Sequence, residues 1–315
     1  MSFLRIIGLL YCGCLFVVSL NASAIELLVA APVRMDVAQS QFVDKFVHRL
    51  QKATSQRISI ISPAAAASLA GDSVVLLTVG PEVLDEVLNG KGTLPVIAVY
   101  VPRQQFLEEV RALPNGAKRL VTLVDSDPDL KKQLALAEIL FGARATCTLV
   151  TGLRDQSLLK DFKQFAKQID LPLIIRTAEH DTSLQNLLSE ESRQAVIIID
   201  RSAALTTSLD LKTYLEQAYE LNRQGVIAFS PRIVDAGALG TTYSSDDELA
   251  GLISDTLHKI GQGRNVPLIQ HTEHFEVKLN HFLARSLNTR QLDDEQLKKE
   301  IELLLEVAEK KGASQ

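Results

Sequence analysis

Nine short aliphatic runs follow one another along the chain, with polar segments between them. Runs of this length that are apolar at nearly every position are typical of parallel strands buried on both faces of a sheet. We therefore predict nine buried parallel strands, at residues 25–31, 57–61, 74–79, 96–101, 120–124, 146–150, 173–177, 196–199 and 226–229.

The segments between these runs carry apolar residues at helical spacing. One apolar stripe falls at residues 42–50, a second at 162–169 and a third at 249–260. The third follows Asp246, Asp247 and Glu248, and acidic residues in a first turn are favoured by the helix dipole. Each stripe predicts a helix that covers a sheet: Phe42, Phe46, Val47, Leu50; Phe162, Phe165, Ala166, Ile169; Leu249, Leu252, Ile253, Thr256, Leu257, Ile260.

Strands that alternate with helices predict α/β architecture, and nine strands suit two doubly wound parallel-sheet lobes better than one open sheet. The expected boundary is Asp125–Pro128, since Pro128 suits the first turn of a new helix. We expect lobe 1 at residues 25–125 and lobe 2 at 126–237. The small-residue strip 237–242 would cross back, with 238–264 returning to lobe 1 and 268–288, including a strand at 275–279, returning to lobe 2.

Residues 289–315 predict a charged amphipathic C-terminal helix, with Leu297, Ile301, Leu304, Leu305 and Ala308 on one face. Two interpretations are open for this helix. It could pack on the body of the protein, or it could bind a partner.

Residues 1–24 have the features of a signal peptide. Arg5 precedes an apolar stretch at residues 6–20, and Ala22-Ser23-Ala24 is a small-residue cleavage pattern. The stretch is shorter than the roughly 20 residues of a spanning helix, so we expect a periplasmic chain that is not transmembrane after cleavage. Lipid attachment at Cys14 is the alternative, but the apolar stretch continues past it. Cys147 is then the one remaining cysteine, and we expect an inert, buried thiol.

The chain has 315 residues, and its formal net charge is −5 without a block of like charge. A nucleic-acid partner usually needs a basic stripe, so we expect none.

Several segments resemble the substrate-binding proteins of ABC transporters in the tryptophan/tyrosine-type family, which have the type I periplasmic binding protein fold. They are VVLLTVGPEVLDEVL at 74–88, LPVIAVYVP at 94–102, AVIIIDRSAAL at 195–205, residues 226–264 and FEVKLNHFLARSLN at 275–288. The resemblance implies two lobes joined by a three-crossing hinge, a small-molecule ligand in the cleft between them, and delivery to an ABC permease. We expect no cofactor, and an enzyme is the least supported function, since no positioned nucleophile–base pair is visible in the sequence.

In doubly wound sheets, ligands bind beyond the carboxyl ends of the strands, so the loops there hold the candidate residues. In lobe 1 these are Arg34, Gly80, Pro81, Glu82 and Arg103; in lobe 2 they are Thr151, Gly152, Arg154, Asp200, Arg201, Ser202, Ser230 and Arg232; Tyr243 follows the expected crossing.

Each of the more specific candidates has an ordinary interpretation beside the functional one. Gly80-Pro81 could open a helix whose free N–H groups hold a carboxylate, or form a simple turn. Asp200 could bind an amino group, or cap a helix or pair with its neighbour. Arg232 could clamp a carboxylate by two parallel hydrogen bonds, or it could be a solvated arginine or form an interlobe ion pair. Tyr243 could stack on an aromatic ligand, or pack at the hinge.

Other possible motifs lack the residues that their chemistry needs. Asp125-Ser126-Asp127 resembles the end of a phosphoacceptor strand but has no matching lysine pattern, and Gly90–Thr93 lacks the upstream glycine of a phosphate loop. On a strand, His271 and His274 would point to opposite faces, so no metal site is expected. The chain has no Gly-x-Ser-x-Gly elbow.

These features predict an exported solute-binding protein of an ABC transporter that captures a small molecule, with amino acids and related anions as the first candidates. The alternative is a periplasmic regulatory protein that uses the same fold to bind a membrane sensor or envelope protein. Residues 32–35 and 102–109 motivate it, because they depart from the family pattern.

Overall fold

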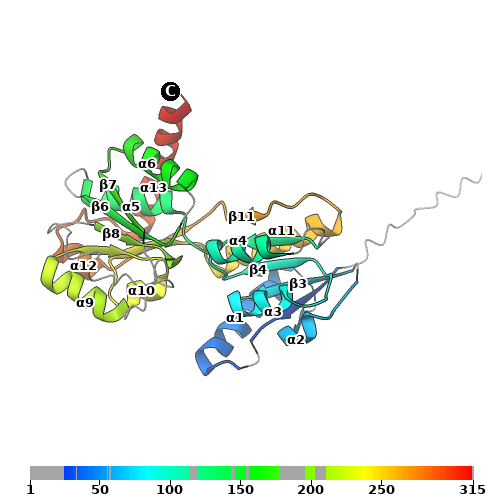
Figure 1. Cartoon of the computed structure of the whole chain (residues 1–315). Helices are drawn as coiled ribbons and strands as arrows, with labels where there is room; N and C mark the ends of the chain where they lie inside the picture. The colour runs from blue at the N-terminus through cyan, green and yellow to red at the C-terminus, as the bar shows by residue number, and fades with distance from the viewer. Residues whose placement is uncertain are drawn as a thin grey trace, which may run out of the picture.

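The computed structural model describes residues 25–32, 34–54, 56, 58–71, 73–113, 119–142, 146–153, 156–177, 196–202 and 211–313. Its strands form two separate sheets, each of six strands in the described chain, and each sheet has its own helices (Figure 1). The predicted fold class is confirmed: two α/β lobes stand side by side and are joined by a hinge.

Lobe 1 has strands in the order β2-β1-β3-β4-β5-β11, and the described pairings are parallel. Its strands are β1 (Glu26–Ala30), β2 (Ile58–Ile61), β3 (Val74–Val79), β4 (Val96–Val99), β5 (Val121–Val124) and β11 (Ile269–Gln270), and its helices are α1 (Val37–Thr54), α2 (Pro63–Ala66), α3 (Pro81–Leu88), α4 (Arg103–Ala112) and α11 (Asp246–Gly261).

Lobe 2 has strands in the order β7-β6-β8-β9-β10-β12, and β12 pairs antiparallel to β10 at the edge. Its strands are β6 (Cys147–Thr151), β7 (Leu173–Thr177), β8 (Val196–Ile199), β9 (Gly225–Ile227), β10 (Gly240–Tyr243) and β12 (Glu276–Leu279), and its helices are α5 (Leu130–Phe141), α6 (Gln156–Gln168), α9 (Leu211–Asn222), α10 (Pro231–Asp235), α12 (His281–Ser286) and α13 (Asp294–Ala313).

Both faces of each sheet are buried at the central strands, which is why those strands are apolar at nearly every position, whereas the edge strands β2 and β7 are partly exposed. In β3, Val75 and Leu77 face α1 and α11, whereas Leu76 faces α3 and α4. In lobe 2, α5, α6 and α13 cover one face, and α9 and α10 cover the other. All nine predicted strands are present, and the three predicted helical stripes are the buried faces of α1, α6 and α11.

Three segments of the described chain pass between the two sheets: residues 125–129, 244–245 and 271–275. The prediction that residues 237–242 cross between the lobes is wrong. Most of this segment precedes or forms β10, which belongs to the lobe 2 sheet and pairs with β9 and β12, and the chain crosses at residues 244–245 instead. The small residues of β10 allow close packing within lobe 2. A Cβ at Gly240 would lie 3.1 Å from the Lys278 carbonyl oxygen. The chain then turns at Ser244-Ser245, where Ser245 and Glu248 form a capping box that starts α11.

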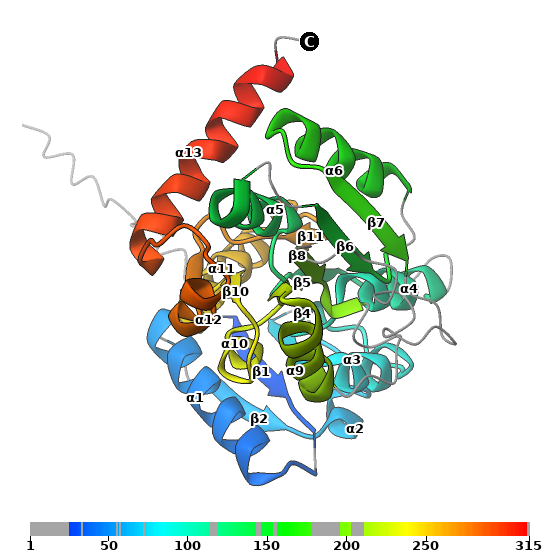
Figure 2. The same cartoon turned by 90° about the vertical axis from the view of Figure 1, so that its left-hand side faces the viewer.

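The C-terminal helix α13 packs on lobe 2 through Leu297, Ile301 and Ala308 (Figure 2). Cys147 is buried in the core of the same lobe, as predicted. In the described part of the chain, no helix has the length and apolar character that crossing a membrane requires. The predicted signal peptide and Arg154 lie outside the described residues.

Candidate functional site

A cavity of about 200 Å³ lies between the lobes, beside the first and third crossings. One water molecule needs roughly 10–15 Å³ on the same measure, so the cavity has room for a small organic molecule. Lobe 1 contributes the start of α4, and lobe 2 contributes α5, α6 and the loops after β6, β8 and β9. The lining residues are Arg103, Gln104, Asp125, Asp127, Pro128, Asp129, Leu130, Lys131, Gln133, Leu153, Leu158, Phe162, Ile199, Asp200, Arg201, Ser202, Phe229 and His271.

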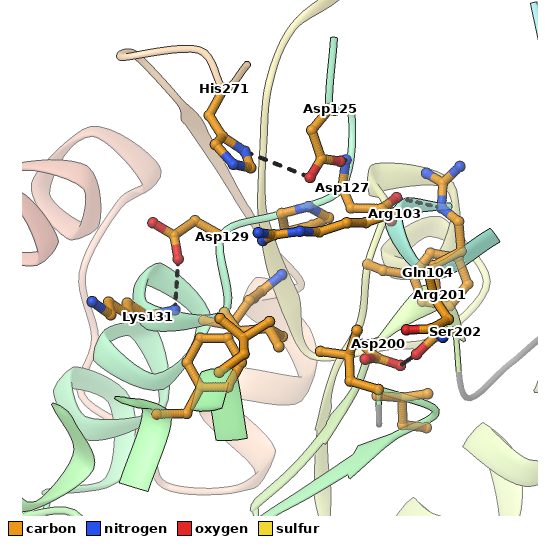
Figure 3. Close-up of a pocket in the computed structure, with 18 residues that line it drawn as sticks. Arg103, Gln104, Asp125, Asp127, Asp129, Lys131, Asp200, Arg201, Ser202 and His271 are labelled. Atoms are coloured by element: carbon orange, nitrogen blue, oxygen red, sulfur yellow. Dashed lines mark hydrogen bonds and ion pairs between the residues drawn. The ribbon is translucent and has the colours of Figure 1, made fainter. Parts of the chain in front are cut away.

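Two arginines reach this cavity from opposite lobes (Figure 3). Arg103 is the first residue of α4, directly after Pro102. Arg201 follows β8, and its Nε lies 2.7 Å from Oδ1 of Asp127 in the first crossing. The geometry of this contact is that of an ion pair and not of an aligned hydrogen bond. The guanidinium of Arg201 also lies over the ring of Phe229, 5.6 Å from its centroid. Positive charge from both lobes therefore meets at one place.

Asp125 and His271 connect the first crossing with the third. Nδ1 of His271 lies 3.5 Å from Oδ2 of Asp125, and the side chain of Asp125 is only 4% exposed. Burial and the neighbouring Asp127 raise the pKa of Asp125 to about 7, although Arg103 and Arg201 act in the opposite direction. Burial, and then Arg103, lower the pKa of His271. The site thus holds a buried carboxyl group that keeps its proton to a higher pH than an ordinary aspartate does.

The carboxylate of Asp200 is held by its own lobe. The hydroxyls of Thr151 and Ser202 both donate to it, the latter at 2.7 Å, and the backbone N–H of Gly152 donates to Ser202 Oγ at 2.8 Å. A Cβ at Gly152 would lie 2.9 Å from the Ser202 backbone, so the close approach needs glycine. These bonds favour the interpretation that Asp200 shapes the loop that carries Arg201.

One wall of the cavity is apolar. It combines the starts of α5 and α6 with the ends of β6, β8 and β9, and its members are Leu130, Leu153, Leu158, Phe162, Ile199 and Phe229. A ligand that fits here would present charged groups to the crossings and an apolar part to lobe 2.

The structure brings some of the predicted site residues together and separates others. Arg103, Asp200, Arg201 and Ser202 line the cavity, and Thr151 and Gly152 support them from behind. Tyr243 lines a smaller adjoining cavity of about 40 Å³ that shares Asp125 and His271 with the first. Besides Thr151 and Gly152, the predicted residues outside both cavity linings are Arg34, Gly80, Pro81, Glu82, Ser230 and Arg232.

The residues outside the cavity have other surroundings. Gly80 caps α3 at φ 91°, a left-handed conformation that favours glycine. Arg34 is exposed. Arg232 lies over the ring of Phe42, 5.5 Å from its centroid, and so links α10 of lobe 2 to α1 of lobe 1. The contact joins the two lobes, but it is a cation–π contact and not the interlobe ion pair that the sequence suggested.

Sequence reasoning missed the cavity residues that lie on the crossings, above all Asp125, Asp127 and His271. The acidic segment was recognised as a boundary, and its position after a strand was the signal that it also faces a cleft. Gln133 was missed too. It is buried in α5 and donates to the Ala228 carbonyl at 3.0 Å. Among the described residues, no group of three histidine, cysteine or acidic side chains could hold a metal ion.

Solved structures resemble this arrangement over most of the chain. An ABC domain from Streptococcus pneumonia in complex with L-Trp is 13% identical with a TM-score of 0.57, and the match covers 87% of this chain and 98% of that one. A ligand-free, open substrate-binding protein with adhesive properties from Clostridium difficile is 15% identical with a TM-score of 0.60. That match covers 86% of this chain and 98% of the other. A conserved domain protein from Vibrio cholerae is 15% identical with a TM-score of 0.56, and the match covers 86% of this chain and 96% of the other.

The chain therefore has the type I periplasmic binding protein fold. At these identities, the likeness shows the fold alone. No family model matches the chain, and no curated protein does.

Proposed function

We propose that this chain is an exported solute-binding protein that captures a small zwitterionic molecule, of the amino-acid kind, and delivers it to an ABC permease. The observation that carries the proposal is the interlobe cavity, which combines Arg103 and Arg201 with buried carboxyl groups and an apolar wall. A zwitterion with an apolar side chain needs all three features at once.

The two arginines suggest how binding and lobe closure are coupled. A ligand carboxylate that accepts hydrogen bonds from Arg103 of lobe 1 and Arg201 of lobe 2 makes both sets of contacts only when the lobes are close together. The ligand then shifts the population toward the closed state, because it binds that state more tightly. The hinge for this motion is the set of three crossings.

The opposite charge of the ligand would face the first crossing. Asp125 is buried and Asp127 is partly buried beside the cavity, and a ligand ammonium would compensate their charge. The pKa of Asp125 is raised to about 7 without a ligand, so we expect an ammonium group to favour the ionised carboxylate and to release a proton. The apolar part of the ligand would lie against Phe162 and Phe229.

Calorimetric titration and thermal-shift measurements on residues 25–315 test this proposal. The panel consists of L-amino acids, the corresponding amines that lack the carboxylate, and monosaccharides. We expect an apolar amino acid to bind, and its amine to bind at least about tenfold more weakly, because hydrogen bonds to charged groups contribute about 1.5–3 kcal/mol each.

Two variants of α4 provide the matched comparison. Arg103→Ala removes a cavity residue, whereas Arg111→Ala removes an exposed arginine from the last turn of the same helix. We expect Arg103→Ala to weaken binding by at least about tenfold and Arg111→Ala to leave it unchanged. If no member of the panel binds, or if both variants behave alike, the proposal is wrong.

The alternative function is a regulatory protein that binds a membrane sensor. Arg34 and Val37 are exposed residues of lobe 1, Val37 with an exposed fraction of 75%, and neither lines the cavity. A pull-down from detergent-solubilised envelope distinguishes the two functions. Recovery of a permease supports transport, and recovery of a sensor without a permease supports regulation.

A further inference from the structure

One carboxylate of the hinge lies beside both arginines of the cavity. Asp127 belongs to the first crossing, whereas Arg103 begins α4 of lobe 1 and Arg201 follows β8 of lobe 2. Among the described residues, Asp127 is the acidic residue of the cavity that forms an ion pair with one of these arginines. A dashed line marks this contact in Figure 3. The first crossing therefore contacts a charged group that would bind the ligand.

The guanidinium of Arg201 is held on two sides. Its Nε lies 2.7 Å from Oδ1 of Asp127, and its plane lies over the ring of Phe229, 5.6 Å from the ring centroid. The side chains of Arg201 and Asp127 are only 21% and 20% exposed, so salt screens this pair less than a surface pair. The contact with Asp127 uses Nε, and the two terminal nitrogens of the guanidinium stay available to a ligand carboxylate. Asp127 thus fixes the orientation in which Arg201 presents them.

The same carboxylate lies at the start of α4. The N-cap residue of this helix is Pro102, whose side chain makes no capping hydrogen bond, so the free N–H groups of the first turn need another acceptor. Burial raises the pKa of Asp127, and the charge of Arg201, a hydrogen bond from the backbone N–H of Arg103 and the charge of Arg103 oppose this rise. Asp127 therefore acts in place of a capping side chain. It supports the turn from which the Arg103 side chain reaches the cavity.

The other aspartates that line the cavity have different partners. Asp200 accepts hydrogen bonds from two hydroxyls of its own lobe. Asp129 caps α5, and Asp125 lies 3.5 Å from Nδ1 of His271. None of these described contacts involves an arginine. Asp127 is therefore the aspartate whose loss would release the arginines and leave the other contacts of the cavity in place.

We propose that Asp127 is a positioning residue, which holds Arg103 and Arg201 in the places where a single ligand carboxylate accepts hydrogen bonds from both. The inference rests on the proposed function and deepens it. Since Arg201 already compensates the charge of Asp127, the ligand ammonium is left to Asp125. Arg103 and Arg201 move with different lobes, so Asp127 contacts both only while the lobes are close together. The carboxylate site is then complete only in the closed state.

Calorimetric titration of the Asp127→Asn variant of residues 25–315 tests the proposal. The probes are L-leucine, L-phenylalanine and L-tryptophan, each beside the amine that lacks its carboxylate: isoamylamine, phenethylamine and tryptamine. We expect the variant to bind the amino acid at least about tenfold more weakly and the amine within about twofold of the unaltered chain, because only the carboxylate contacts the displaced arginines. The preference for the amino acid over its amine should therefore be lost.

The matched control is Asp247→Asn. Asp247 also pairs with an arginine at 2.7 Å, but its partner is Arg49 and both residues lie outside the cavity lining. This variant should keep both affinities. If Asp127→Asn weakens amino acid and amine equally, Asp127 contacts the ammonium or only supports the fold, and if it strengthens the amino acid, Asp127 competes with the ligand carboxylate. Either result overturns the inference.

A double substitution shows whether Asp127 acts through Arg201. Arg201→Lys keeps the charge but removes the planar fork and the Nε that Asp127 contacts. Two independent tenfold losses multiply to about a hundredfold, whereas linked residues lose clearly less in combination. We expect the smaller loss of amino-acid affinity, and a multiplied loss would overturn the inference. If the unaltered chain binds none of the amino acids, the proposed function is wrong and the inference with it; if it binds them and Asp127→Asn keeps the preference, only the inference is wrong.

Discussion

The buried carboxyl group of Asp125 leads to a pH-dependent prediction that the substitution Asp125→Asn tests. Burial and the neighbouring Asp127 raise the pKa of Asp125 from its ordinary 3.8 to about 7 in the folded chain. The folded state therefore binds more protons than the unfolded state between these two values. Its stability is fully present below about pH 4 and decreases as the pH rises through about 7.

The size of this effect follows from the two pKa values. A difference of about 3 corresponds to about 4 kcal/mol of unfolding free energy. The two aspartates titrate as a coupled pair, and burial also raises the pKa of Asp127, so Asp127 keeps part of the pH dependence in the variant. We therefore expect Asp125→Asn to remove about half of it, ~2 kcal/mol. The asparagine oxygen can still accept the hydrogen bond that the backbone N–H of Asp127 makes to Asp125 at 2.9 Å. We therefore expect the loss of charge to dominate.

Urea unfolding of residues 25–315, followed by far-ultraviolet circular dichroism, measures the effect. At about pH 4 the variant should equal the unaltered chain, and at about pH 8 it should be ~2 kcal/mol more stable. The control is Asp235→Asn, because Asp235 is exposed and makes a surface ion pair with Lys278 at 2.6 Å. It should change stability by less than about 1 kcal/mol at both pH values. Parallel pH profiles for the Asp125 variant and the unaltered chain would refute the reasoning.

Two further predictions concern the core and the contact between the lobes. Burial raises the pKa of the Cys147 thiol. A thiol reagent should therefore modify the folded chain of residues 25–315 at least about a hundredfold more slowly than the urea-unfolded chain. Equal rates would show that the thiol is accessible. Arg232→Gln removes the interlobe contact with Phe42, and a cation–π contact at an exposed site contributes about 0.5–1 kcal/mol. The population of molecules with open lobes should therefore rise about two- to fivefold. The radius of gyration measured by X-ray scattering should increase. Arg223→Gln removes a similar contact with Tyr219 inside lobe 2 and should leave the radius unchanged.

Much of the fold could be predicted because burial on both faces of a sheet leaves a visible pattern. Each of the nine aliphatic runs is a strand, since a strand between two helical layers needs apolar side chains on both sides. The strands β10 and β11 lack this pattern. Gly240–Tyr243 is made of glycine, threonine and tyrosine, and Ile269–Gln270 has two residues, so both depend on strands that are distant in the sequence. The crossing was misplaced for the same reason.

The candidate site was predictable where its residues directly follow strands. Arg201 and Ser202 come after β8, and Arg103 begins the helix after β4. The sequence could not show that Asp125 and His271 approach each other, because they are 146 positions apart and lie on different crossings. It also could not show that Gly80 stays outside the cavity, although Gly80 follows a strand as Arg201 does.

The sequence by itself determined two sheets, their helices and the loops from which a ligand site could be built, because periodicity and burial are local properties of the chain. The tertiary structure alone decided which loops meet. Three crossings fix the position of one lobe against the other, and that position selects the arginines, the carboxyl groups and the apolar wall that share one cavity. Contacts between lobes depend on this rigid-body arrangement, and short-range patterns of residues do not encode it.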